Sequence, residues 1–107
     1  KKTNQILKKQ IKKGLKSINN KSKIIIAYEP VWSIGTGLIP KEADLNKTIS
    51  FIKSRFVKKY PKILYGGSVN TNNVSILKKI ASIDGFLIGG ASQNPKKFID
   101  IIKKTIN

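Results

Sequence analysis

Residues 24–37 read Ile-Ile-Ile-Ala-Tyr-Glu-Pro-Val-Trp-Ser-Ile-Gly-Thr-Gly, and they carry the clearest information about the fold. The first five residues are continuously apolar and rich in β-branched side chains. Such a short run is typical of a parallel strand that is buried on both faces. A loop marked by Gly and Pro follows over residues 30–40. The stretch therefore predicts a buried strand over residues 24–28 that opens into a loop.

Two further strands of the same kind follow along the chain. Residues 63–65 precede Gly66-Gly67, and residues 85–88 precede Gly89-Gly90. The remaining segments have the apolar period of helices, which predicts helices over residues 4–18, 41–59, 74–80 and 95–106. Strands that alternate with helices imply right-handed crossovers and a parallel sheet. The fold class is therefore α/β, and no domain boundary interrupts it.

Three strands are too few to close a barrel, and an open sheet of three parallel strands leaves long edges unpaired. The chain also contains no Met, even at position 1. We therefore expect a processed chain or the downstream part of something longer. On this interpretation further strands come from an upstream segment or from a partner.

The composition excludes several kinds of site within these 107 residues. Without Cys there is no disulfide, thiolate metal site or Cys nucleophile. Without His there is no Ser-His-Asp triad and no imidazole acid or base. No apolar run approaches the roughly 18 residues that cross a membrane, and no signal peptide is evident. We expect neither a metal site nor a membrane partner.

The charge is strongly basic, with 22 Lys and Arg against 5 Asp and Glu and a net charge of +17. One interpretation is a nucleic-acid-binding protein. Against it, Arg55 is the only Arg, whereas base and phosphate recognition favours the guanidinium group. The lysines are also spread over every predicted helix. A solvated basic surface is therefore favoured over a specific nucleic-acid site.

Each predicted strand is followed by residues that could bind a substrate or react with it. Parallel α/β folds place their functional sites at the carboxyl ends of the strands. Glu29 directly follows the first strand. A carboxylate partly desolvated at a strand end suits a general base, although a helix-capping or salt-bridged Glu is an equal alternative from position alone. Residues 31–37 combine Trp32, an apolar tip and two glycines, as a moving lid requires. The alternative is a packed surface loop.

The second and third strands end in Gly66-Gly67-Ser68 and Gly89-Gly90-Ala91-Ser92. Glycines allow backbone N–H groups to approach an anion closely, and a following helix adds partial positive charge. Each pair alone is a weak signal, since turns also require glycine. Together with Glu29, the two pairs predict a site for a small phosphorylated substrate that loses and regains a proton.

These motifs resemble those of the triosephosphate isomerase family. The similar segments are residues 27–37, Ala-Tyr-Glu-Pro-Val-Trp-Ser-Ile-Gly-Thr-Gly; residues 65–69, Tyr-Gly-Gly-Ser-Val; and residues 84–92, Asp-Gly-Phe-Leu-Ile-Gly-Gly-Ala-Ser. Their order and approximate spacing are also similar, over essentially the whole chain. Three such motifs together are a specific signal.

The resemblance implies an eight-stranded (βα)₈ TIM barrel. Residues 1–107 would form the C-terminal part of this single domain, with about the last three βα units and a preceding helix, and without the N-terminal strands. It implies an isomerase of glycolysis and gluconeogenesis that interconverts dihydroxyacetone phosphate and glyceraldehyde 3-phosphate through an enediolate. It further implies no cofactor, a homodimer once the missing N-terminal half is present, and a cytoplasmic location.

The resemblance also implies roles for individual residues. Glu29 matches the catalytic base, whose use in this enzyme is a known example of general-base catalysis combined with lid closure. The backbone N–H groups matching the phosphate cradle are those of Gly35, Ser68, Gly89 and Gly90. The matched lid and latch residues are Pro30, Val31, Trp32, Ile34, Thr36, Gly37, Tyr65 and Leu87. Of these, Ile34 and Leu87 match the apolar pair that closes on the base, and Tyr65 acts with Ser68 in the latch.

The chain departs from the family pattern in several ways. The electrophilic His and the substrate-binding Asn and Lys of the family lie on earlier strands and are absent from this chain. We therefore expect negligible isomerase activity from these residues alone. Within the lid, Ser33 replaces the commoner Ala, which is expected to be a small change. Pro40 has no N–H to offer the latch, so the closed lid would be held differently.

Two other functions are consistent with parts of the pattern. A different phosphate-binding barrel, such as a sugar-phosphate epimerase or an aldolase-like lyase, would share the glycine pairs. The Tyr-Glu-Pro-Val-Trp sequence argues against it, and no Lys lies in the apolar part of a predicted strand for a Schiff base. If the chain is instead a basic binding module for nucleic acid or anionic membrane, its binding affinity should fall steeply as the salt concentration rises.

Overall fold

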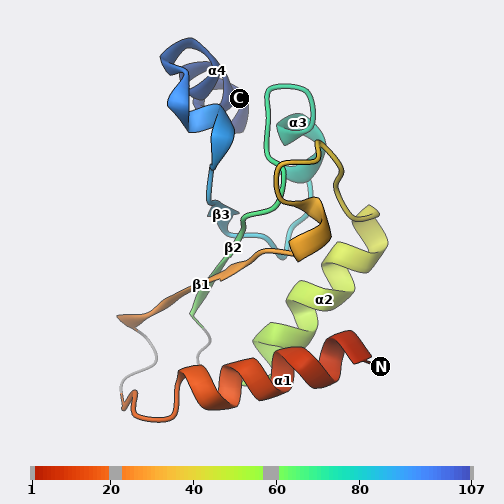
Figure 1. Ribbon diagram of the computed structural model, residues 1–107, viewed down its shortest axis with the longest axis vertical. Coiled ribbons are helices and arrows are strands. Elements are labelled where there is room, and N and C mark those ends of the chain that lie inside the picture. Colours follow the sequence, from red (N-terminus) through yellow and green to blue (C-terminus); the bar gives the residue numbers. More distant parts are fainter. Residues whose placement is uncertain (1, 20–22, 57–60, 107) are drawn as a thin grey trace.

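The computed structural model describes residues 2–19, 23–56 and 61–106 (Figure 1). Within these ranges three parallel strands alternate with helices, which confirms the predicted α/β order. With η denoting a 3₁₀ helix, the elements in chain order are α1 (Lys2–Gly14), β1 (Ile25–Tyr28), η2 (Val31–Ser33), α2 (Glu42–Ser54), β2 (Lys62–Tyr65), α3 (Val74–Leu77), β3 (Gly85–Phe86), η3 (Gly90–Gln93) and α4 (Pro95–Ile106).

The central strand is β2, which pairs in parallel with β1 on one side and β3 on the other. Two further backbone bonds continue the ladders past the strand ends. The N–H of Gly66 donates to the carbonyl of Tyr28 at 2.9 Å, and the N–H of Leu87 donates to the carbonyl of Tyr65 at 3.0 Å. The carboxyl ends of the three strands therefore lie side by side, and Glu29 follows the first of them.

One hydrophobic core joins β2 to α2, α3 and α4. In Figure 1, α1 and α2 lie in the lower half of the view, whereas α3 and α4 lie in the upper half. The buried apolar residues of α2, α3 and α4 pack in this core with those of β2, because burying them removes apolar surface from water. The buried apolar residues of the core are Leu45, Ile49, Ile52, Ile63, Tyr65, Val69, Val74, Leu77, Ile80 and Ile101.

β1 is less buried than its sequence predicts. Ile25 is 66% exposed and Ala27 is also exposed, whereas Ile26 and Tyr28 are half-buried. The prediction of a strand buried on both faces is therefore wrong for this structure. The reason is that nothing in the described part of the chain covers the face that carries Ile25 and Ala27. The outer edge of β1 likewise has no neighbouring strand there.

The predicted boundaries of three helices and one strand differ clearly from those observed. The helix predicted over residues 74–80 is α3, which ends at Leu77. The helix predicted over residues 4–18 is α1, which ends at Gly14, a residue of low helix propensity. The helix predicted over residues 41–59 is α2, which ends at Ser54, where the side chain donates to a backbone carbonyl of the last turn. Residues 57–60 of that prediction lie outside the described residues. The strand predicted over residues 85–88 is only two residues long, because β2 ends and offers no further partner.

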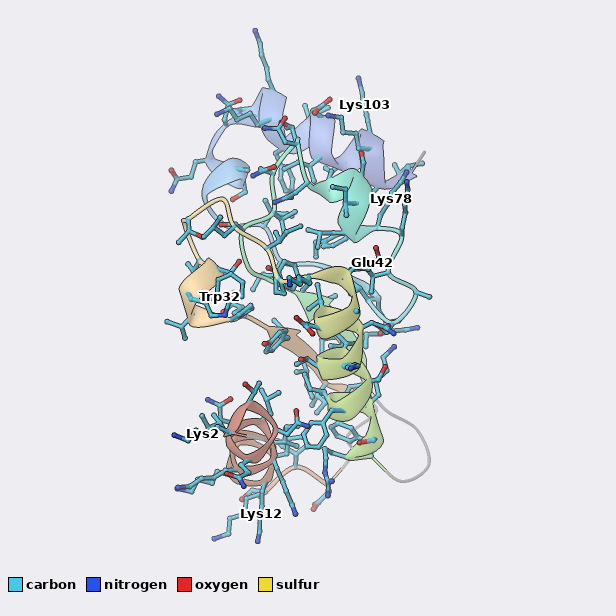
Figure 2. All side chains as sticks on the ribbon, turned by 90° about the vertical axis from the view of Figure 1, so that its right-hand side faces the viewer. Lys2, Lys12, Trp32, Glu42, Lys78 and Lys103 are labelled. Carbon is cyan, nitrogen blue, oxygen red and sulfur yellow. The ribbon has the colours of Figure 1, made fainter. Side chains whose placement is uncertain are left out.

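Lysines are distributed over both ends of the molecule. In Figure 2, the labelled Lys2 and Lys12 lie on α1, and Lys78 and Lys103 lie at the opposite end. Some have structural contacts: the ammonium of Lys104 donates to the carbonyl of Thr71 at 2.8 Å, and that of Lys78 donates to the carbonyl of Lys104 at 2.7 Å. Within the described ranges, no helix has the length and apolar character needed to cross a membrane.

Candidate active site

A cavity of about 700 Å³ lies at the carboxyl ends of the three strands. Its wall is formed by residues that follow each strand and by part of the loop after β1. Because the three strand ends are adjacent, residues that are far apart in the sequence meet there. The predicted site residues that line it are Glu29, Ile34, Gly35, Gly37, Ser68, Leu87, Gly89 and Gly90.

Glu29 stands at the wall of this cavity with an exposed side chain. The expected partial desolvation is therefore wrong for this structure, again because the described chain leaves this side of the sheet uncovered. The side chain passes close to Gly66. A Cβ added to Gly66 would lie 2.7 Å from Cγ and 2.8 Å from Oε1 of Glu29, closer than real Cβ atoms come to their neighbours. A glycine is thus needed for the carboxylate to occupy this place.

The loop after Glu29 consists of η2 and a turn that requires glycine. Gly35 and Gly37 have φ angles of 72° and 77°, in the left-handed region that other residues rarely adopt. Between them, the hydroxyl of Thr36 donates to the carbonyl of Ser33 at 2.9 Å and accepts from the N–H of Leu38 at 3.1 Å. These contacts order the turn internally, as a rigid tip requires.

Ser33 joins this loop to the end of β2. Its side chain is fully buried, and its hydroxyl donates to the carbonyl of Leu38, accepts from the N–H of Ser68 at 3.1 Å and lies 3.0 Å from the hydroxyl of Tyr65. The hydroxyl of Ser68 in turn donates to the carbonyl of Ser33 and accepts from the N–H of Gly37 at 2.9 Å. An Ala at position 33 could form none of these hydroxyl contacts, so the expectation of a small change from Ala calls for a direct test.

Tyr65 is buried and does not line the cavity, and its hydroxyl contacts Ser33 of the loop. Burial raises the pKa of its phenol, the hydrogen bond with Ser33 opposes this rise, and the nearby Tyr28 adds to it. Tyr65 therefore keeps its proton at neutral pH and can donate it to Ser33. A Cβ at Gly67 would collide with the hydroxyl groups of Tyr65 and Ser33. The second glycine of the pair is thus needed for these two side chains to meet.

The glycines after β3 have a different environment. A Cβ at Gly89 or Gly90 would have no atom within 4 Å, so the backbone there faces open space. The next residues form η3, in which the N–H and the hydroxyl of Ser92 both donate to the carbonyl of Gly89, at 2.9 and 2.6 Å. The turn after β3 is therefore stabilised by hydrogen bonds within itself, and the backbone at Gly89 and Gly90 remains exposed to the cavity that the two glycines line.

Three predicted lid residues do not line this cavity. Pro30, Val31 and Trp32 instead line a groove of about 540 Å³ between η2, β1 and α1. Figure 2 shows Trp32 on η2, and its side chain is 54% exposed. Thr36 and Tyr65 also lie outside the wall and act on the loop through the hydrogen bonds described above. The structure thus separates residues that border the cavity from residues that support it.

Comparison with known proteins assigns the family. The family model described as triosephosphate isomerase matches residues 1–105. The chain belongs to the triosephosphate isomerase family. The resemblance inferred from the three motifs is thereby confirmed.

Curated relatives named triosephosphate isomerase agree with this assignment. The protein from Thermodesulfovibrio yellowstonii is 43% identical over 108 residues, covering 95% of this chain and 44% of the relative. The protein from Mycoplasma mobile is 47% identical over 102 residues, covering 95% and 42%. The protein from Dictyostelium discoideum is 51% identical over 92 residues, covering 79% and 36%. The chain thus spans less than half the length of these triosephosphate isomerases.

Sequence reasoning missed several polar residues of the cavity wall, and Lys97 is the charged residue among them. The others are Asn70, Thr71, Asn72, Gln93 and Asn94. Lys97 lies in the first turn of α4, where its N–H donates to the side-chain oxygen of Asn94 at 3.1 Å. The signal that could have revealed it is the pair Asn94-Pro95, because Asn before Pro marks the start of a helix. With that start fixed, Lys97 falls close to the glycine pair that matches the phosphate cradle of triosephosphate isomerases.

Proposed function

We propose that the complete gene product, of which these 107 residues form a part, is a triosephosphate isomerase. It interconverts dihydroxyacetone phosphate and glyceraldehyde 3-phosphate. The observation that carries the proposal is that one cavity collects Glu29, Ser68 and the backbone of three residues suited to hold a phosphate: Gly35, Gly89 and Gly90. Family membership and the names of the curated relatives support it.

Glu29 acts as the base in this proposal. Its carboxylate takes a proton from the substrate carbon next to the carbonyl, and the electron pair of the broken C–H bond forms an enediolate. The protonated Glu29 then returns the proton to the neighbouring carbon, while the hydroxyl proton of the enediolate passes from one substrate oxygen to the other with the help of a group outside these 107 residues. Together the two transfers complete the isomerisation without a cofactor. An exposed, flexible carboxylate at the cavity wall can serve both carbons in turn.

The other cavity residues bind and cover the substrate. Backbone N–H groups at Gly35, Gly89 and Gly90 are suited to the phosphate because they add hydrogen bonds without a mobile side chain. The N–H of Ser68, the fourth cradle position, donates to Ser33 in this structure. Ile34 and Leu87 are apolar, about half exposed and on the same wall as Glu29. Bound substrate would be covered by both, which excludes water and strengthens the electrostatic interactions of the base.

The remaining assignments concern the complete gene product. We propose a TIM barrel to which this chain contributes about the last three βα units and the helix before them, completed by an N-terminal half that covers the exposed face of β1. The product would be a homodimer that acts in the cytoplasm in glycolysis and gluconeogenesis, without a specific nucleic-acid or membrane partner. The uncovered Ile25 and Ala27 support the need for further strands.

The direct test of the function is an isomerase assay on the complete gene product with glyceraldehyde 3-phosphate. We expect turnover to dihydroxyacetone phosphate without an added cofactor. Turnover of a larger sugar phosphate in place of either triose phosphate would overturn the proposal in favour of another phosphate-binding barrel.

The purified 107-residue chain is expected to show no enzyme-like turnover in the same assay. It contains the proposed base and phosphate cradle, but it has no His, and the oxyanion-stabilising groups that the resemblance implies belong to earlier strands. The measurement is the rate with chain and substrate, compared with a blank and with Glu29→Gln of the same chain. A Glu29-dependent rate in the range of an enzyme would contradict this prediction.

Replacing Lys97 by Gln in the complete gene product is expected to raise KM for the triose phosphate. Lys97 is exposed at the cavity wall, so its attraction for a phosphate is screened by water and amounts to a factor of about two to five. Lys96→Gln is the matched control, because Lys96 is its neighbour on α4 and does not line the cavity. Equal effects of the two substitutions would show that only overall charge matters.

A further inference from the structure

The buried side chain of Ser33 has contacts that the proposed chemistry does not use. Its hydroxyl touches three separate places: the carbonyl of Leu38 at the far end of the loop, the hydroxyl of Tyr65 at the end of β2, and the N–H of Ser68 in the following loop. Few polar side chains are buried in the described residues: apart from the phenol of Tyr65, they are those of Ser33 and Asn73. A buried hydroxyl with this many partners determines where those partners lie.

Counting protons gives each contact a direction. A serine hydroxyl has one proton to donate and two lone pairs to accept with. The proton of Ser33 goes to the carbonyl of Leu38, so the phenol of Tyr65 and the N–H of Ser68 are both donors to its oxygen. The hydroxyl is therefore fully used. Removing it would leave one buried phenol, one amide and one carbonyl without this partner at once.

We propose that Ser33 is a positioning residue that fastens the lid, residues 30–37, and the adjoining Leu38 to Tyr65 and Ser68. The proposal rests on the isomerase function, because the lid and Ser68 belong to the site assigned there. Pro40 cannot donate a backbone hydrogen bond from the end of the loop, and the hydroxyl of Ser33 supplies a side-chain link to Tyr65 instead. The same hydroxyl accepts from the N–H of Ser68, so this N–H, which the resemblance assigns to the phosphate cradle, is used by the loop in this structure.

The test compares Ser33→Ala with unchanged protein in the complete gene product, using amide hydrogen–deuterium exchange resolved by peptide together with steady-state kinetics. Losing the hydrogen bonds of one hydroxyl is expected to speed exchange in residues 34–38 and at Ser68 by about 2- to 10-fold. Exchange in α2 and α3 should stay unchanged. We expect kcat to fall by a similar factor, because the lid spends less time in place.

Two further variants make the result specific. Ser54→Ala removes an exposed hydroxyl that bonds only within α2, and it should change neither the exchange of the lid nor kcat. Tyr65→Phe removes the phenolic hydroxyl that donates to Ser33. In the double variant with Ser33→Ala, the exchange of the lid and kcat should change no further than in Ser33→Ala alone, because both substitutions break the same link. If Ser33→Ala does not fold, Tyr65→Phe carries the test, with the same local acceleration expected.

The outcomes separate this inference from the proposed function. Hydrogen–deuterium exchange is measured without substrate. If the complete gene product lacks isomerase activity, the exchange rates alone therefore test whether Ser33 fastens the lid. Unchanged exchange at residues 34–38 in a fully active Ser33→Ala enzyme would overturn the inference and leave the function intact. Acceleration to the same degree in α2 and α3 would also overturn it, since Ser33 would then contribute only to global stability.

Discussion

Replacing Glu29 by Gln in the complete gene product is expected to lower kcat by about 10²- to 10⁴-fold. The amide has nearly the same shape as the carboxylate but cannot accept a proton from carbon. Because Glu29 is exposed and lies at the cavity wall rather than in the core, the change should leave the fold intact. The measurement is steady-state kinetics, together with the binding of inorganic phosphate as a probe of the cradle.

The chain offers a matched control for this experiment. Its only other Glu is Glu42, in the first turn of α2 and outside the cavity. Glu42→Gln should leave kcat unchanged and affect stability slightly, through a weaker interaction with the helix dipole. Phosphate binding should survive in Glu29→Gln. A parallel loss of rate and of phosphate binding would count against Glu29 as the base and in favour of a structural role at the strand end.

Gly66→Ala is expected to lower kcat by about 10²-fold with little change in melting temperature. The added Cβ would lie 2.7 Å from Cγ of Glu29 and 2.8 Å from Oε1, so the side chain must move away. The group that moves is the end of an exposed, flexible chain, and its displacement costs little stability. It does, however, take the carboxylate from its place at the cavity, and catalysis by proton transfer depends on that place.

Gly14→Ala is the control for the substitution at Gly66. Gly14 ends α1, and a Cβ there would have no atom within 4 Å. This change should leave kcat unaffected and slightly stabilise the helix. The kinetic effect of Gly66→Ala should also disappear in the Glu29→Gln background, because the displaced group no longer works as a base. An active Gly66→Ala enzyme would mean that Glu29 acts from a different position than the one observed.

The parts of the fold that could be predicted are those that local pattern determines. The three short apolar runs, each closed by Glu or glycine, predicted the parallel order because buried strands and their ends have distinctive residues. Glu29 and the pairs Gly66-Gly67 and Gly89-Gly90 were placed together by one general rule, that the carboxyl ends of parallel strands share an edge. The cavity in the structure collects these same residues.

The parts that could not be predicted depend on contacts between distant residues. The partners of Ser33 lie 5, 32 and 35 residues away, so no local pattern indicates them. The cavity wall includes Lys97 because of where α4 starts, a boundary that apolar periodicity does not define sharply. The exposure of Ile25 could not be predicted, because a hydrophobic side chain favours burial but only the surrounding chain determines whether it is buried.

The loop after β1 places two neighbouring residues in opposite surroundings. Ser33 is fully buried, whereas Trp32, the only tryptophan in these 107 residues, is about half exposed. An indole fixed to the backbone beside the fastening point moves with it. Tryptophan fluorescence is sensitive to water, so the emission wavelength and the quenching of Trp32 report the position of the loop. The chain thus carries its own optical probe in the segment predicted to act as a lid.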